Sequence, residues 1–200
     1  MGVVVSSKIR QICSPYDEPS ARIIIVGLDS AGKTTLVQRF KNLVDLQLDI
    51  HASFIESITT EPTFVYQVEN IYPRLSPISF NIWDLGGQEK TRELWKFYLT
   101  DIQGVVFVID CHDAQRIKVA KKELLNLSKK LGRSSIIPIV IAANKQDLPH
   151  SLRKEELIEA LSLPKIQSNE WKVFEMSAHT GGGVMEMFSY LSQFIHTHHQ

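Results

Sequence analysis

The sequence predicts an α/β fold of three layers, in which a mostly parallel six-stranded sheet carries helices on both faces. Short runs rich in Ile and Val alternate along the chain with segments of helical apolar spacing. Several of these runs are continuously apolar, as strands buried on both faces are. The chain has 200 residues, which fits one domain, because domains typically hold roughly 100–200 residues.

Six segments have the composition of strands. The clearest is Arg22–Gly27, a β-branched run with the sequence RIIIVG. Phe64–Ile71 and Ile78–Trp83 flank a loop with two prolines, which suits a hairpin connection. The other three predicted strands are Gly104–Asp110, Ile136–Ala143 and Lys172–Met176.

Five segments have the apolar spacing of helices. Ala114–Leu131 places its apolar residues on one side, and Gly132 follows as a C-terminal cap. Alternation of strands and helices favours a parallel sheet with helices on both faces. The other four predicted helices are Lys33–Val44, Thr91–Leu99, Arg153–Leu161 and Val184–Ile195.

The composition limits the kinds of partner and of cellular compartment that are expected for this protein. Lys and Arg number 22, and Asp and Glu number 22, so the formal net charge is zero. This balance argues against a general nucleic-acid binder, which usually has a basic excess. The two cysteines, Cys13 and Cys111, form no disulfide framework or zinc motif, which favours the reducing cytosol. The longest apolar run, Ile136–Ala143, is far shorter than the ~20 residues of a membrane-spanning helix.

A phosphate-binding motif follows the first predicted strand. The sequence GLDSAGKT fits G-x-x-x-x-G-K-[ST] and opens the first predicted helix, which is the context that the motif requires. Its two glycines let backbone N–H groups converge on phosphate oxygens. We expect Lys33 to reach the β- and γ-phosphates, Thr34 to ligate Mg²⁺ and Thr35 to contact the α-phosphate. The alternative is a glycine-rich turn with a solvated lysine. The predicted phosphate-binding residues are Gly27, Leu28, Asp29, Ser30, Ala31, Gly32, Lys33, Thr34 and Thr35.

A second motif, WDLGGQE, ends another predicted strand. Asp84 at the strand end is placed to hold Mg²⁺ through water. Gly87 can offer its N–H to a γ-phosphate where a side chain would obstruct, and Gln88 would then lie beside the attacking water. With Gly86, these residues complete the predicted contacts around the terminal phosphate. Taken alone, the motif would be a tight turn with an exposed glutamine.

A third motif, Asn144-Lys-Gln-Asp147, follows the strand that starts at Ile136. The Asp147 carboxylate can accept hydrogen bonds from guanine N1–H and the exocyclic amine, a donor pair that adenine lacks. We expect Asn144 to contact the imidazole edge of the base and the Lys145 stem to lie over its face. Ser177 and Ala178 are the second candidate, with a backbone N–H directed at guanine O6. The alternative is a polar turn.

The three motifs together resemble the ADP-ribosylation factor (Arf) and Arf-like branch of the small GTPases. The resembling forms are GLDSAGKTT, WDLGGQE and ANKQDLP, and the similarity covers about residues 20–195. The resemblance implies a three-layer P-loop NTPase fold, the G domain, over residues 21–200. It also implies a Mg²⁺-dependent switch between GTP and GDP.

In this branch, two switch segments near residues 55–66 and 84–100 respond to the nucleotide. The resemblance implies that Thr63 closes on Mg²⁺ and the γ-phosphate when GTP is bound. The hairpin at about 64–83 would shift register and displace the N-terminal segment. Tyr66, Trp83 and Tyr98 match the branch's aromatic effector-binding cluster. Without the resemblance they would be interpreted as core residues.

The implied partners are an exchange factor, an activating protein, effectors and a membrane surface, in vesicle or Golgi-related intracellular transport. Three departures from the family pattern affect the switches. The segment 44–60 is longer than usual, Val65 stands where the family usually has glycine, and the loop Tyr72–Pro77 is slightly long.

The N-terminus carries a candidate lipidation site. Its first six residues, MGVVVS, fit M-G-x-x-x-[ST], which predicts myristoylation of Gly2. Residues 1–20 form a weakly amphipathic, basic segment, and Cys13 is a candidate for palmitoylation or a free thiol. Since one myristoyl chain binds membranes only marginally, a second signal is needed. We expect a cytoplasmic protein attached peripherally to the Golgi or another endomembrane.

The expected reaction is GTP hydrolysis with Gln88 and Lys33 as catalytic residues. Gln88 would orient the water, while Lys33 would absorb developing negative charge. The sequence offers no obvious arginine in cis, so we expect slow hydrolysis that an activating protein's arginine accelerates roughly 10³–10⁵-fold. A GTP-binding scaffold with little hydrolysis is one alternative. A P-loop ATPase or kinase is another, disfavoured by Asp147.

Overall fold

The computed structural model describes residues 19–48, 58, 60–132, 136–167 and 169–198. Six strands form one sheet in the order β2-β3-β1-β4-β5-β6, and every neighbouring pair is parallel except the antiparallel β2 and β3. The predicted mostly parallel six-stranded sheet is therefore confirmed. The strands are β1 (Ser20–Gly27), β2 (Tyr66–Ile71), β3 (Ser79–Leu85), β4 (Gly104–Asp110), β5 (Ile139–Asn144) and β6 (Trp171–Glu175).

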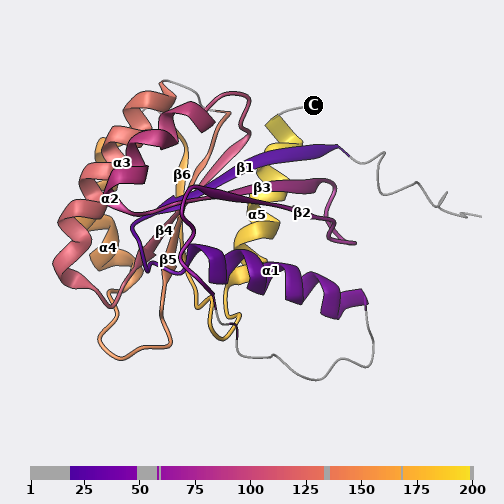
Figure 1. The fold of residues 1–200 in the computed structure, drawn as a ribbon, viewed down its shortest axis with the longest axis horizontal. Coiled ribbons are helices and arrows are strands. Elements are labelled where there is room, and N and C mark those ends of the chain that lie inside the picture. Colours follow the sequence, from indigo (N-terminus) through magenta and orange to yellow (C-terminus); the bar gives the residue numbers. More distant parts are fainter. Residues whose placement is uncertain (1–18, 49–57, 59, 133–135, 168, 199–200) are drawn as a thin grey trace, which may run out of the picture.

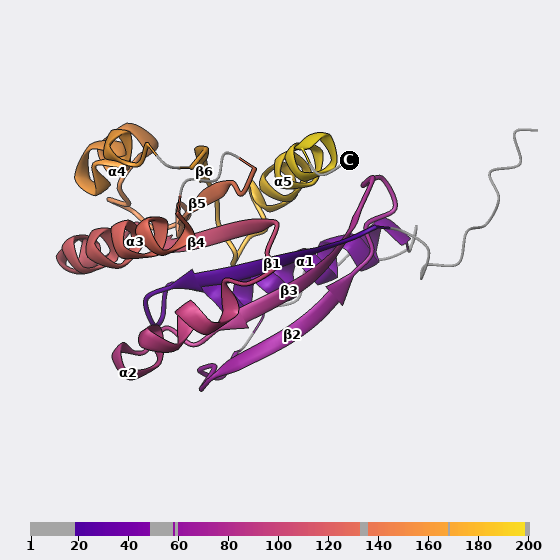
Figure 2. The same ribbon diagram turned by 90° about the horizontal axis from the view of Figure 1, so that it is seen from above.

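Helices cover both faces of this sheet, with α1 and α5 on one side and α3 and α4 on the other (Figures 1 and 2). Side chains alternate between the two faces along a strand. In β1, Ile23 and Ile25 accordingly pack against α1 and α5, while Ile24 and Val26 pack against α3 and α4. The helices are α1 (Lys33–Leu48), α2 (Glu89–Arg92), α3 (Ile117–Leu131), α4 (Lys154–Leu161) and α5 (Val184–His198), with 3₁₀ turns η1 (Glu93–Tyr98), η2 (Ala114–Arg116) and η3 (Leu163–Lys165).

Several element boundaries differ from the sequence prediction, and three of them are informative. The helix predicted over Thr91–Leu99 is a single turn of α2 followed by η1, in which the buried Trp95 indole donates to the Gly86 carbonyl at 2.9 Å. Strand β5 begins at Ile139, after Pro138, because proline has no N–H for the ladder. Strand β2 begins at Tyr66 and leaves two predicted residues in the preceding turn.

The candidate motifs meet at one edge of the sheet. The parallel strands β1, β3, β4, β5 and β6 all end there, and ligands of open α/β sheets bind outside these carboxyl ends. The motifs of the sequence follow directly on β1, β3 and β5 (Figure 1). In the part of the chain that the structure describes, no helix is long and apolar enough to cross a bilayer.

Candidate functional site

A cavity of about 380 Å³ lies at this edge of the sheet, between the loop after β1, the segment before β2 and the turn after β3. The loop after β1 has an unusual backbone. Gly27 has φ 146°, Gly32 has φ 93° and Ser30 has φ 59°. A side chain at Gly27 would overlap the Val108 carbonyl, so glycine is required there. The cavity is lined by Asp29, Ser30, Gly32, Lys33, Thr34, Thr35, Thr60, Glu61, Pro62, Thr63, Gly87, Gln88 and Lys145.

Lys33 is held inside this loop. Its side chain is buried, and the ammonium donates to the Leu28 carbonyl at 2.8 Å. Burial lowers the pKa of Lys33, which the charges of Asp84 and Asp29 offset only in part. Because the buried Lys33 ammonium has lost most of its hydration, it is suited to bind a polyanionic ligand, whose charges would take the place of water.

We expect nucleotide affinity to fall once the pH rises above the lowered pKa of Lys33. Phosphate charge raises the lowered pKa of Lys33, so binding takes up a proton once the pH exceeds that lowered value. The effect on binding spans the pH window between the lowered pKa of Lys33 in the nucleotide-free protein and its higher pKa in the complex. Between the lowered pKa and the ordinary value of 10.5, the free energy of unfolding of the nucleotide-free protein instead rises with pH. The reason is that the unfolded chain holds this proton more tightly than the folded protein does.

The measurement is a GDP titration at several pH values. Lys33→Arg is the matched control, because a guanidinium stays charged throughout this range. A pH dependence in Lys33→Arg equal to that of the wild type would assign the effect to another group.

Three polar side chains meet beneath the cavity. The Thr34 hydroxyl lies 2.5 Å from Asp84 Oδ2, and the Thr63 hydroxyl lies 2.8 Å from that of Thr34 and 3.1 Å from Asp84 Oδ2. Asp84 Oδ1 is buried and has no hydrogen-bond partner among the described residues. Burial raises the pKa of Asp84, while hydrogen bonds from the two threonines and the charge of Lys33 act in the opposite direction.

This cluster fits Mg²⁺, which favours oxygen ligands and uses one or two carboxylates together with substrate phosphates and water. The sequence placed Thr34, Thr63 and Asp84 around the metal, and the structure brings all three together. The buried, unpartnered carboxylate oxygen of Asp84 is the observation that favours a cation here. No group of three or more His, Cys, Asp or Glu side chains suited to a metal occurs among the described residues.

The turn after β3 contacts the phosphate loop directly. The Gly87 carbonyl accepts hydrogen bonds from the Asp29 N–H at 3.1 Å and from Arg92 Nε at 2.8 Å. A Cβ on Gly87 would lie 2.6 Å from the Asp29 nitrogen, so only glycine fits. Gly86 donates its N–H to the Val65 carbonyl at 2.8 Å. The exposed Gln88 side chain lines the cavity and makes no capping hydrogen bond to α2.

The loop after β5 begins at Asn144, whose side chain contacts two other loops. The Asn144 amide donates to the Ala31 carbonyl at 2.8 Å, and its oxygen accepts from the Ala178 N–H at 2.9 Å. The side chain, 2% exposed, therefore ties two loops together, and the contact to Ala31 uses one of the two amide N–H groups. The Ala178 N–H is engaged in the same contact, and the Ser177 N–H donates to the Gly182 carbonyl at 2.9 Å. Both N–H groups therefore have a protein acceptor in this structure.

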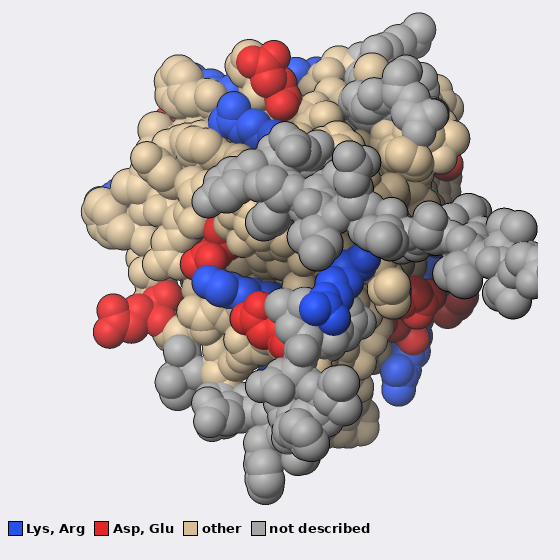
Figure 3. Space-filling model, turned by 90° about the vertical axis from the view of Figure 1, so that its right-hand side faces the viewer, with Lys and Arg blue, Asp and Glu red and all other residues tan. Residues whose placement is uncertain are grey.

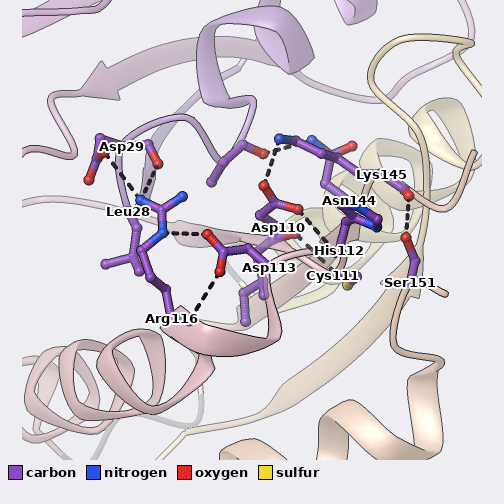
Figure 4. Close-up of polar contacts among 12 residues, drawn as sticks. Leu28, Asp29, Asp110, Cys111, His112, Asp113, Arg116, Asn144, Lys145 and Ser151 are labelled. Atoms are coloured by element: carbon purple, nitrogen blue, oxygen red, sulfur yellow. Dashed lines mark hydrogen bonds and ion pairs between the residues drawn. The ribbon is translucent and has the colours of Figure 1, made fainter. Parts of the chain in front are cut away.

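Lys145 of this loop lines the cavity, and Figure 4 shows it beside Asp110 and Ser151. The Lys145 ammonium pairs with Asp110 Oδ2 at 2.6 Å, and its backbone has φ 67°. Ser151 Oγ donates to the Lys145 carbonyl at 2.7 Å and fixes this strained turn. Asp147 is exposed. It follows the lining residue Lys145 by two positions in sequence but does not itself line the cavity.

Three arginines that the sequence analysis did not single out support the site. Arg39 on α1 is buried, and its guanidinium donates to the carbonyls of Ala178 and His179. Arg92 and Arg116 both pair with Asp29 in the phosphate loop. Of these arginines, only Arg116 has a partner that the local sequence could have indicated, Asp113 three positions earlier.

The three predicted effector residues form one aromatic cluster. Ring centroids are separated by 5.2 Å between Tyr66 and Trp83, by 5.5 Å between Tyr66 and Tyr98, and by 5.8 Å between Trp83 and Tyr98. The cluster is partly accessible, since Tyr66 is 47% exposed, and Phe64 and Phe97 beside it in sequence are 75% and 67% exposed.

The predicted lipidation residues, Gly2 and Cys13, lie outside the described residues. Strand β1 begins at Ser20, one residue before the predicted start of the domain. The segment 44–60 is described only in part. Its first residues continue α1 as far as Leu48, four residues beyond the predicted helix end.

Comparison with known proteins gives a consistent result. The ADP-ribosylation factor family model matches residues 6–195. ADP-ribosylation factor 1 of Brassica rapa subsp. pekinensis and ADP-ribosylation factor 3 of Arabidopsis thaliana are each 36% identical over 192 residues, covering 96% of this chain and 96% of the relative. The Arl6 BBS3 small GTPase from Trypanosoma brucei, solved with the bound nucleotide analogue GppNp, superposes with TM-score 0.75 at 28% identity, covering 90% of this chain and 99% of that one.

Proposed function

Since the chain belongs to the ADP-ribosylation factor family, whose members are GTP-hydrolysing small GTPases, we propose that it is a Mg²⁺-dependent switch that recruits effectors to membranes. Residues 21–200 would be the switching domain and residues 1–20 a myristoylated anchor. One observation carries the proposal: Thr63 from the first switch meets Thr34 and Asp84 at the wall of the phosphate cavity. Closure of Thr63 onto this point is what a γ-phosphate-sensing switch requires.

The hydrolysis that we propose needs positioning and charge neutralisation rather than covalent chemistry. Gln88, exposed on the cavity wall, would orient the attacking water. Lys33 Nζ and the loop N–H groups would hold the terminal phosphates and stabilise charge that develops there. Mg²⁺ held by Thr34, Thr63 and Asp84 would supply a divalent charge to the phosphate oxygens. The alternative of a scaffold with little hydrolysis is not favoured, because the family consists of hydrolases.

Selection of guanine would rest on Asp147. Its carboxylate is exposed, and Lys145, two positions earlier in the sequence, lines the cavity. The Gln146 N–H donates to the Met176 carbonyl at 3.2 Å, which ties this turn to the end of β6. The carboxylate is therefore held on a fixed turn, where it could accept both guanine donors.

Effector binding would use the aromatic cluster of Tyr66, Trp83 and Tyr98. Two of these residues come from the hairpin β2–β3 and one from η1, so both switch regions contribute to one surface. A movement of either element would break up the cluster. This arrangement can make binding of a partner depend on the nucleotide.

The far end of the hairpin supports a link to the N-terminal segment. A cavity of about 210 Å³ lies there between α1, the β2–β3 loop and α5, and Phe40, Leu75, Phe80, Met185 and Phe188 line it. Pro19, the first described residue, lies beside β3, since the Ser79 N–H donates to the Pro19 carbonyl at 3.0 Å. A shift of the hairpin would therefore change what the N-terminal segment can contact.

Charge on this end of the molecule does not by itself suggest membrane binding. Figure 3 shows Lys and Arg interspersed with Asp and Glu over its visible, described surface, with no large region of one sign. Attachment to an endomembrane, in vesicle or Golgi-related transport, would therefore depend on the acylated N-terminus.

We expect membrane attachment to require both the acyl chain and the triphosphate. Full-length protein co-expressed with an N-myristoyltransferase should float with neutral phosphatidylcholine vesicles when loaded with a slowly hydrolysed GTP analogue and stay largely in solution with GDP. The Gly2→Ala variant, which cannot be acylated, is the matched control and should stay in solution with either nucleotide. Equal flotation with GDP and the analogue would contradict the switch, and flotation of Gly2→Ala would contradict the anchor.

A further inference from the structure

Five side chains of alternating charge connect the phosphate loop to the second switch and to α3. In order they are Asp113, Arg116, Asp29, Arg92 and Glu123. Asp29 is the central member and belongs to the phosphate loop. A carboxylate beside a polyphosphate opposes binding unless cations neutralise it. The two arginines supply that neutralisation, but they hold Asp29 in different ways.

Arg116 holds the outer side of the loop. Its Nη1 lies 3.2 Å from the Asp29 carbonyl oxygen and 3.2 Å from Asp29 Oδ2. Arg116 is itself fixed by Asp113, whose Oδ2 accepts from Arg116 Nε at 2.5 Å (Figure 4). The next loop residue, Ser30, has φ 59°, a backbone conformation that persists only where neighbouring contacts maintain it.

Arg92 holds the inner side and reaches three elements at once. Its Nε donates to the Gly87 carbonyl at 2.8 Å, and its Nη2 lies 3.4 Å from Asp29 Oδ1. Its Nη1 lies 3.7 Å from Glu123 Oε1 on α3. The Arg92 side chain is only 11% exposed, whereas its partner Asp29 is 46% exposed, so the arginine is largely buried at a pair that solvent reaches from the Asp29 side.

The contact between Gly87 and Asp29 competes with a phosphate. The Asp29 N–H donates to the Gly87 carbonyl at 3.1 Å, and a phosphate loop binds its ligand through such N–H groups. A Cβ on Gly87 would lie 2.5 Å from the Gly27 carbonyl oxygen, so the Gly87 backbone occupies the loop's interior. A terminal phosphate that uses the Asp29 N–H must displace the Gly87 carbonyl.

We propose that Asp29, Arg92 and the Gly87 carbonyl form a latch that holds the second switch against the phosphate loop and lowers the preference for GTP over GDP. The inference rests on the proposed function. Displacing the Gly87 carbonyl breaks its hydrogen bonds from Asp29 and Arg92, so the cost falls on the nucleotide with a third phosphate. The Arg116 contacts involve only the outer carbonyl and carboxylate of Asp29 and need not break. Arg92 is therefore a positioning residue for nucleotide selectivity, whereas Arg116 supports binding of both nucleotides.

The two arginines give a matched experiment on the full chain. Affinities for GDP and for a slowly hydrolysed GTP analogue are measured with Mg²⁺ for the wild type, Arg92→Gln and Arg116→Gln. We expect Arg92→Gln to raise the preference for the analogue over GDP by about 10-fold, since loss of a hydrogen bond to a charged group changes an affinity by roughly this factor. Arg116→Gln should weaken both nucleotides by similar factors and leave their ratio within about 2-fold.

A second pair of variants separates selectivity from stability. Arg92→Lys keeps a cation but cannot bridge three partners, so its ratio should lie between those of the wild type and Arg92→Gln. Asp29→Asn keeps the side-chain size and should shift the ratio in the same direction as Arg92→Gln.

Equal weakening of both nucleotides in Arg92→Gln, or a ratio shift in Arg116→Gln as large as in Arg92→Gln, would overturn the latch. A folded wild-type protein that binds neither guanine nucleotide would instead overturn the proposed function on which the latch rests.

Discussion

The Gln88→Leu variant is expected to remain loaded with GTP in the presence of an activating protein that empties the wild type. Gln88 is exposed on the cavity wall and makes no capping hydrogen bond to α2. Leucine is of similar size, so the substitution should leave the fold and GTP affinity nearly unchanged. A positioned group that orients or deprotonates water contributes roughly 10²–10⁴-fold to a rate, and stimulated hydrolysis should fall by that factor.

The measurement is single-turnover hydrolysis of bound GTP, with and without the activating protein. Gln115→Leu is the matched control, because Gln115 is also exposed but lies on η2, outside the cavity lining. It should hydrolyse GTP as the wild type does. A Gln88→Leu variant that hydrolyses GTP at the wild-type stimulated rate would remove Gln88 from the mechanism.

Thr34→Asn is expected to weaken Mg²⁺-dependent GTP binding by about 10²-fold. The Thr34 hydroxyl lies 2.5 Å from Asp84 Oδ2 and 2.8 Å from the Thr63 hydroxyl, so a larger amide displaces two of the proposed metal-holding groups. A hydrogen bond to a charged group contributes ~1.5–3 kcal/mol, which corresponds to roughly 10–10²-fold in affinity.

Thr34→Ser serves as the control because it keeps the hydroxyl. GTP affinity is measured for both variants with Mg²⁺ and with a chelator. The loss in Thr34→Asn should disappear when the metal is chelated, and Thr34→Ser should stay close to the wild type. An unchanged GTP affinity of Thr34→Asn in Mg²⁺ would contradict the metal assignment.

Local sequence patterns predicted the fold because they report directly on burial. The continuous apolar run in β1 is buried on both faces, with Ile23 and Ile24 each 0% exposed. The phosphate loop could also be predicted from the sequence, because Gly27 and Gly32 are needed for backbone angles that few other residues adopt. The same pattern could not distinguish α-helix from 3₁₀ turn after residue 91, since the anchoring of Trp95 on Gly86 is a tertiary contact.

Contacts between distant parts of the chain account for the rest of the site. Asn144 was predicted to contact the base, but its bonds to two other loops were not predicted, because these partners lie 113 and 34 residues away in sequence. Arg92 and Asp29 are separated by 63 residues, and no local pattern marks such a pair. Arg39 was missed because an arginine within a helix is usually solvated, whereas here it is 1% exposed.

Nucleotide competition on the full-length protein tests the central claim most directly. A fluorescent GDP analogue is bound in the presence of Mg²⁺ and displaced with GTP, GDP or ATP. We predict that GTP and GDP displace it and that ATP does so at least 10³-fold less effectively, because adenine leaves the Asp147 carboxylate without its donors. Displacement by ATP at the same concentration as GTP, or no binding of the analogue by the folded protein, would contradict a guanine-nucleotide switch.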